Sequence, residues 1–213
     1  MMVSNSQQHW NGHQMCVIDT ETSGLYSDWH EILQICILPL DADLEPRKDV
    51  YPFYINMLPE YPERFHPEAI KKNKLTIKYL LETGIDREKA KDLLDEWVNK
   101  LGLPVTRYGS PKQILPIGHN YNGFDKAFIE TWLGKDLANQ YFHGHGRDTL
   151  TATLFLNDSA AMHADTIQFP KLSLTNISSR MEIPHEGAHD ALVDCQLVAQ
   201  VYKRLCQQGL LSL

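Results

Sequence analysis

A short apolar stretch that ends in two carboxylates constrains this chain more than any other feature of its sequence. Residues 15–18 (MCVI) are apolar on both faces of a β-strand, as expected for a strand buried in the centre of a sheet. Asp19 and Glu21 follow, and because strand side chains alternate, both point to the same face. Their Cβ atoms should lie about 6–7 Å apart at the usual strand rise. Both carboxylates can therefore bend toward one point.

The carboxylates of Asp19 and Glu21 need a partner at that position. Two anions at the rim of an apolar strand repel each other and resist loss of water. A divalent cation relieves both problems, and oxygen ligands suit a hard ion such as Mg²⁺ or Mn²⁺. The simpler alternative is a solvated strand end that leads into the turn Thr22-Ser23-Gly24. Asp19 and Glu21 alone do not decide between a metal site and a solvated strand end.

Composition describes an ordinary globular chain. Its 213 residues suffice for one large domain, and the hydrophobic content of 43% is enough to build a core. No apolar run approaches the ~18–20 residues of a membrane span, and the polar start lacks the pattern of a signal peptide. We therefore predict a flexible tail over residues 1–13, one domain over residues 14–213, a cytoplasmic location and no membrane partner.

Charge and cysteine usage narrow the function classes. A formal net charge of −7 counts against coating duplex nucleic acid, which needs a basic stripe. The negative net charge is compatible with an enzyme that binds only a few terminal nucleotides at a metal site, because bound cations offset part of the acidity. Four cysteines in apolar patterns without a CxxC pair predict buried free thiols in a reducing compartment: Cys16, Cys36, Cys195 and Cys206.

The order of strands and helices predicts an α/β domain. The first three strands have short connections, so at least part of the sheet should be antiparallel. Loops are expected over residues 102–112 and 157–170, which show no helical period. The expected strands cover residues 15–18, 31–40, 48–55, 113–118 and 146–148. The expected helices begin at Pro67, Ile77, Arg87, Gly123, Thr149 (to residue 156) and Leu172, and the last covers residues 188–208.

Lysines gather on the first two helical patterns. The simplest interpretation is a solvated helix face. The alternative is a contact for the phosphates of a nucleic acid strand. The sequence leaves both open for the four residues concerned: Lys71, Lys72, Lys74 and Lys78.

Three more residues that could bind a metal ion or transfer a proton lie near the starts of expected helices. Asp125 would fall at the third position of a helix capped by Asn122, so a capping box explains it as well as metal binding does. Asp194 lies one turn after Asp190 beside an apolar stripe, where an acid packs poorly and repels its neighbour. His189 stands where the last helix begins, and a lone histidine there is more often structural than catalytic.

The set carries more information than any of its members. The motifs DxE at a strand end, HNxxxFD between strand and helix, and HxAxxD at the last helix follow one another along the chain. In this order they resemble the DEDDh family of 3′→5′ exonucleases, which includes polymerase proofreading subunits, oligoribonuclease and RNase T. The match runs from Val17 to Leu205 and includes HPEAI at residues 66–70, RDTL at 147–150 and LSL at 172–174.

The resemblance implies a fold, a cofactor and a set of roles. The fold would be ribonuclease H-like, a mixed five-stranded sheet flanked by helices on both faces. Two Mg²⁺ or Mn²⁺ ions would activate a water molecule and stabilise the leaving oxygen of a phosphodiester. The implied metal ligands are Asp19, Glu21, Asp125 and Asp194, the implied general base is His189, and the implied substrate contacts are Thr22, Leu25 and Asn120.

The implied activity is release of nucleoside 5′-monophosphates from the 3′ end of single-stranded nucleic acid, with DNA favoured. A 3′→5′ exoribonuclease on short RNA is the alternative, because the contacts that sense the 2′-hydroxyl are not visible in the sequence. The nucleic acid 3′ end is the expected partner, and no protein partner is indicated. An inactive relative that only binds single strands is a third class, against which the presence of all five motif residues argues.

One motif points to different chemistry. His185-Glu186-Gly187-Ala188-His189 matches HExxH, the zinc metalloprotease signature. That signature needs both histidines on one helical turn, yet Pro184 precedes it and Gly187 lies inside, at a cost of about 1 kcal/mol in a helix. Zinc proteolysis would also leave the four acids unexplained, so it is a distant alternative.

Overall fold

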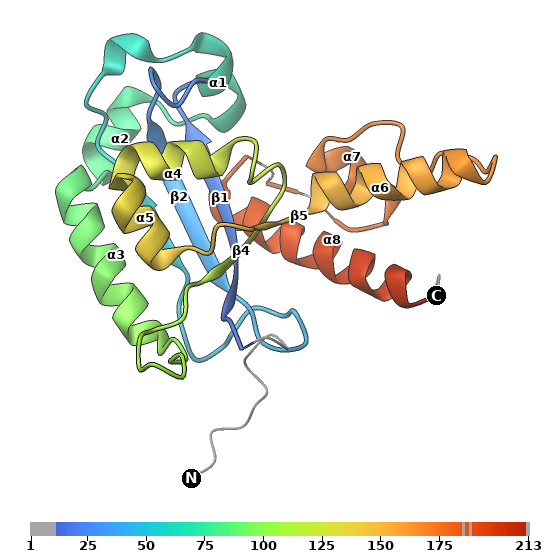
Figure 1. Ribbon diagram of the computed structural model, residues 1–213. Helices are drawn as coiled ribbons and strands as arrows, with labels where there is room; N and C mark the ends of the chain where they lie inside the picture. Colours follow the sequence, from blue (N-terminus) through green and yellow to red (C-terminus); the bar gives the residue numbers. More distant parts are fainter. Residues whose placement is uncertain (1–11, 185, 188, 212–213) are drawn as a thin grey trace.

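The protein is built on one five-stranded mixed sheet (Figure 1). The structure, a computed structural model, describes residues 12–211 except 185 and 188. The strand order is β3-β2-β1-β4-β5, with β3, β2 and β1 antiparallel and β4 and β5 parallel to β1. The predicted α/β class with a mixed five-stranded sheet is confirmed. The strands are β1 (Met15–Thr22), β2 (Ile32–Pro39), β3 (Phe53–Asn56), β4 (Leu115–Gly118) and β5 (Arg147–Asp148).

Helices cover both faces of the sheet. Three of them, α3, α4 and α5, lie on one face, and α8 crosses the other, with α6 and α7 packed beside α8 (Figure 1). The helices are α1 (Pro67–Asn73), α2 (Ile77–Thr83), α3 (Arg87–Leu101), α4 (Asp125–Leu133), α5 (Lys135–Tyr141), α6 (Thr149–Met162), α7 (Leu174–Arg180) and α8 (Ala191–Leu211), with a 3₁₀ turn at Pro62–Arg64. None of these helices, within the part of the chain that is described, is long and apolar enough to cross a membrane.

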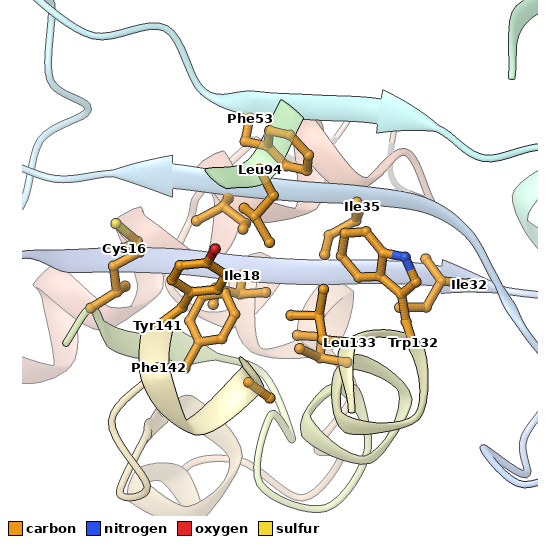
Figure 2. Packing of buried hydrophobic residues seen from close by; sticks show 14 of the residues in the cluster. Cys16, Ile18, Ile32, Ile35, Phe53, Leu94, Trp132, Leu133, Tyr141 and Phe142 are labelled. Carbon is orange, nitrogen blue, oxygen red and sulfur yellow. The ribbon is translucent and has the colours of Figure 1, made fainter. Parts of the chain in front are cut away.

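The alternation of β1 sorts its side chains into two cores. Cys16 and Ile18 face α3 to α5, where Ile18 packs in the cluster that contains Leu94 and Trp132 (Figure 2). Val17 faces α8 on the opposite side. Each fully buried aliphatic side chain of this kind contributes about 1.5–3 kcal/mol. The two cores together hold β1 in the middle of the sheet, so the residues at its C-terminal end have a fixed position.

Several local predictions are confirmed by cap geometry. Pro67 opens α1 at its first turn, where a missing N–H costs nothing. The Thr76 side chain accepts a hydrogen bond from the Tyr79 amide at the start of α2. Asp86 caps α3 in the same way, and Gly102 ends it with φ 69°.

Other local predictions are wrong. The third strand covers only Phe53–Asn56, because Pro52 has no amide proton for the ladder and the chain before it is irregular. Helix α6 continues to Met162, so the first part of the expected loop 157–170 is helical. Its apolar residues are spread around the helix, and no period marks its end. Helix α5 was not expected, and Cys206 is exposed whereas the other three cysteines are buried.

The predicted boundary of the tail is not tested. Residues 1–11 lie outside the described residues, and β1 begins at Met15. Residues 12–14 are described, and Gln14 is already buried, with its side-chain amide donating to the Leu40 carbonyl at 2.7 Å. The ordered chain therefore includes at least this part of the segment that precedes the strand.

Candidate active site

All eight residues singled out from the motifs line one open pocket at the C-terminal end of β1. Its volume is about 390 Å³. The pocket is formed where the end of β1 meets the start of α4 and the start of α8. Chain segments more than 100 residues apart in sequence therefore meet there. The eight residues are Asp19, Glu21, Thr22, Leu25, Asn120, Asp125, His189 and Asp194.

The four carboxylates share an electrostatic environment. Burial, followed by the negative charges of Asp125, Glu21 and Asp194, raises the pKa of Asp19 well above its usual range. Burial and the neighbouring Asp194 raise the pKa of Glu21 to about 7, and burial raises the pKa of Asp125 to about 7. Acids held this way favour either a proton or a cation at neutral pH.

Three side chains that line the pocket, two carboxylates and one imidazole, have the spacing of metal ligands. One ligand atom each from Glu21, His189 and Asp194 lies within 4.8 Å of the other two. Asp194 is 8% exposed, and its Oδ1 is buried without a hydrogen-bond partner among the described residues. An unpaired buried carboxylate oxygen is costly unless something binds it. The donor set consequently fits a hard divalent cation.

Asp125 is held by β1 and does not cap its own helix. Its Oδ1 accepts hydrogen bonds from the Thr20 amide (2.9 Å) and the Thr20 hydroxyl (2.6 Å). Helix α4 begins at Asp125 with Phe124 at the N-cap and no side-chain cap. The predicted cap by Asn122 is wrong, because residues 121–124 form a turn in which the Asn122 side-chain amide instead donates to the Gly146 carbonyl at 3.3 Å. The capping-box explanation for Asp125 no longer holds.

His189 precedes α8 in a left-handed backbone conformation, with φ 77°. Its amide donates to Asp194 Oδ2 at 3.2 Å, which ties the histidine to an acid of the pocket. Burial, and then the charges of Lys72 and Lys74, lower the pKa of the His189 imidazole. The neutral imidazole that results near pH 7 can accept a proton.

The HExxH interpretation lacks its helix. His185 lies outside the described residues, whereas Gly187 has φ 82° and His189 has φ 77°, and α8 begins only at Ala191. Positive φ values are incompatible with an α-helix of L-residues. This segment therefore does not present the second histidine on a helical turn.

A hydrogen-bond network that runs from buried Gln34 to the exposed Tyr54 supports the start of α8, and sequence reasoning missed it. The Gln34 amide group donates to the Tyr54 hydroxyl at 3.0 Å, and its Oε1 accepts from the Ala191 amide at 2.8 Å. The Tyr54 hydroxyl donates to Asp190 Oδ2 at 2.6 Å. The available signal was Gln34, a polar residue inside the apolar run ILQICIL, in register with Glu21 on β1. Thr20 was also missed, although it stands between the two acids.

Comparisons with known proteins support the fold. No family model and no curated protein matches the sequence. Exonuclease I of E. coli, solved in complex with a dT13 oligonucleotide, matches with a TM-score of 0.68 and 15% identity over 94% of this chain. Exonuclease I of Methylocaldum szegediense matches with a TM-score of 0.69 and 20% identity over 92% of this chain. Cell-death related nuclease 4 (CRN-4) matches with a TM-score of 0.64 and 15% identity over 92% of this chain.

These relatives are longer than this chain. It spans 43% of the E. coli exonuclease I chain, 40% of the M. szegediense chain and 64% of the CRN-4 chain. The fold that these three structures share with this chain is ribonuclease H-like, and all three are structures of nucleases. The resemblance to 3′→5′ exonucleases that the motifs indicated is thus confirmed at the level of the fold.

Proposed function

We propose that this protein is a DEDDh-type 3′→5′ exonuclease that releases nucleoside 5′-monophosphates from single-stranded nucleic acid, with DNA favoured. The observation that carries the proposal is the convergence of four carboxylates and one histidine, including the unpaired Asp194 Oδ1, in an open pocket. The oligonucleotide in the matched exonuclease I structure supports a single-stranded substrate. The fold shared with the matched exonuclease structures supports a similar arrangement of strands and helices around the pocket.

Asp19, Glu21, Asp125 and Asp194 would hold the metal ions. When bound, two Mg²⁺ or Mn²⁺ ions supply an activated water and stabilise the leaving oxygen. His189 would accept a proton from the attacking water on an imidazole nitrogen, and its lowered pKa keeps the imidazole neutral and able to do so near pH 7. The proton acceptor is tied to the acids through the bond between its amide and Asp194.

The rim of the pocket would hold the terminal nucleotide. The Leu25 side chain is 72% exposed, which for a leucine at a pocket rim offers an apolar surface to a base. The Thr22 hydroxyl donates to the Gly24 carbonyl at 2.6 Å and fixes the turn that carries Leu25. The Asn120 backbone amide, which also lies at the pocket, donates to Asp148 Oδ1 at 3.0 Å. These two bonds fix the chain at two of the segments that line the pocket.

Digestion of end-labelled nucleic acid tests the proposal. Single-stranded DNA, duplex DNA and RNA, labelled at either end, are incubated with Mg²⁺ or Mn²⁺, beside Asp19→Ala as the control. We expect a ladder from the 5′-labelled single strand, early release of the 3′ label, and no reaction with the variant. Products cut internally from a circular substrate would contradict the proposal.

The same assay separates the alternatives. Faster loss of RNA than of DNA supports the exoribonuclease on short RNA. Metal-dependent binding without shortening supports the inactive relative. The protease needs a separate peptide-cleavage assay, in which cleavage that depends on zinc and survives Asp19→Ala would support it.

A further inference from the structure

One lysine stands apart from the basic patch that the sequence shows on residues 71–78. Lys72, from α1, is the only lysine or arginine among the described residues that line the candidate active pocket. Lys71 and Lys78 carry the same charge on α1 and α2 but do not line it. The tertiary structure therefore assigns different surroundings to lysines that look equivalent in the sequence.

Helix α1 is anchored beside the acids at both of its ends. The His66 amide, just before the helix, donates to the Ser23 carbonyl at 2.7 Å. At the other end, the Asn73 side chain, only 7% exposed, donates to the Thr22 carbonyl at 3.1 Å. Lys72 is the neighbour of Asn73, so its backbone has a fixed position relative to Glu21 on β1.

The charge of Lys72 reaches the pocket without being neutralised. Lys72 lines the same pocket as Glu21, His189 and Asp194, so its ammonium group faces the site where a substrate anion would enter. Lys72 forms no ion pair with any residue that the structure describes. A lysine that is unpaired, exposed and beside an acidic site is available to an incoming anion.

The charge balance of the proposed site leaves one anion to be compensated. Four carboxylates and two divalent cations cancel, whereas each phosphodiester of the substrate brings one further negative charge. The chain as a whole carries a net charge of −7, so its overall field repels a nucleic acid strand. A compact ammonium on a flexible stem can follow a phosphate as a point charge.

We propose that Lys72 binds a phosphate of the substrate strand inside the candidate active pocket. This inference rests on the proposed nuclease function and adds a substrate-binding residue to it. The contact accounts for how an acidic protein holds a polyanion at this pocket. It also predicts that this one residue contributes to the salt dependence of substrate binding.

Salt dependence of binding tests the contact directly. A fluorescent oligodeoxythymidylate with phosphorothioate links at its 3′ end is titrated by anisotropy at saturating Mg²⁺ and several salt concentrations. One phosphate contact on a single strand contributes about 0.7 to the slope of log K against log salt. We expect Lys72→Ala to bind more weakly and to lose about 0.7 from the slope. When the salt concentration rises fourfold, the ratio of the parent's binding constant to that of Lys72→Ala should therefore fall about 2.6-fold.

Matched variants exclude a merely structural effect. Lys72→Arg should keep the slope of the parent protein, and Lys71→Ala, from the same helix, should leave both affinity and slope unchanged. A Lys72→Ala protein with the affinity and slope of Lys71→Ala overturns the inference, and a parent that binds no oligonucleotide overturns it as well.

The two proposals fail in distinguishable ways. A parent that digests DNA while Lys72→Ala shows an unchanged slope removes the lysine contact and leaves the nuclease. A parent that binds with the expected change of slope but digests nothing keeps the lysine contact and removes the nuclease.

Discussion

The Tyr54 hydroxyl donates a 2.6 Å hydrogen bond to the Asp190 carboxylate and so joins edge strand β3 to the segment that carries His189. Asp190 Oδ1 in turn accepts from the Leu192 amide at 3.0 Å, which orients the first turn of α8. His189 and Asp194 lie one and four residues away from Asp190. Strand β3, which contributes no residue to the pocket lining, thus helps to set the position of two pocket residues.

Tyr54→Phe should weaken metal binding more than it weakens the fold. The change removes the bond to Asp190, with a loss of stability of about 1 kcal/mol. Direct partners of metal ligands typically contribute 10–100-fold to metal affinity. Tyr54 acts on Asp194 only through Asp190, so we expect a loss of up to about tenfold in a Mn²⁺ titration by calorimetry. Tyr51→Phe, at an exposed tyrosine, is the matched control. Equal Mn²⁺ affinities for both variants would show that the β3 bond does not position the site.

Thr20→Val should raise the pKa of Asp125 further. The variant keeps the shape of the side chain but removes the 2.6 Å hydroxyl bond, one of the interactions that lowers this pKa. A hydrogen bond to a charged group contributes about 1.5–3 kcal/mol, so Mg²⁺ binding at pH 7 should weaken and the optimum of activity should move to higher pH. Thr131→Val, on the exposed side of α4, serves as the control. A pH profile that matches the control would contradict this role for Thr20.

The protein without metal should lose stability as pH rises. In the folded state the pKa of Glu21 is raised from 4.5 to about 7 and that of Asp125 from 3.8 to about 7. Folded protein therefore binds protons more tightly than unfolded protein, and this stabilisation is complete below about pH 4 and is lost as pH rises through about 7. With chelator present, we expect a lower melting temperature at pH 8 than at pH 5.5. Adding Mg²⁺ or Mn²⁺ at pH 8 should restore it.

A variant that lacks one of these carboxylates tests whether their ionisation causes the loss of stability at high pH. Glu21→Gln cannot ionise, so the metal-free variant should show a smaller loss between pH 5.5 and pH 8 than the parent. The rise in melting temperature that added metal causes at pH 8 should also be smaller in this variant than in the parent. An identical pH dependence in both proteins would mean that other groups cause the loss.

Leu25→Ala should affect substrate binding without affecting stability. The side chain is 72% exposed, and exposed substitutions usually change stability by less than about 0.5 kcal/mol. Its removal takes apolar surface from the proposed site of the terminal base, so KM should rise while the melting temperature stays constant. Leu81→Ala, at a leucine 64% exposed on α2 and outside the pocket lining, is the control. An unchanged KM would place the terminal base elsewhere.

Local chemistry made much of the fold predictable. The apolar run before Asp19 predicted the central strand, and Thr76 and Asp86 predicted their helix starts correctly because a cap acts within a few residues. The end of α6 was not predictable in this way. The Asn157 side chain bonds both the amide and the carbonyl of Phe169, a residue distant in sequence, and so joins the helix to the returning chain.

The motifs alone identified which residues could take part in chemistry, because they place acids and a histidine at strand and helix ends. The folded chain was needed to choose between the explanations of each residue. Asp125 could have capped its own helix, and it bonds Thr20 instead because β1 and α4 pack together. The four lysines carry one charge each, and only Lys72 among them lines the pocket with the acids, which no local pattern encodes. Long-range packing determines these differences, since the groups involved lie on segments that only the folded chain brings into contact.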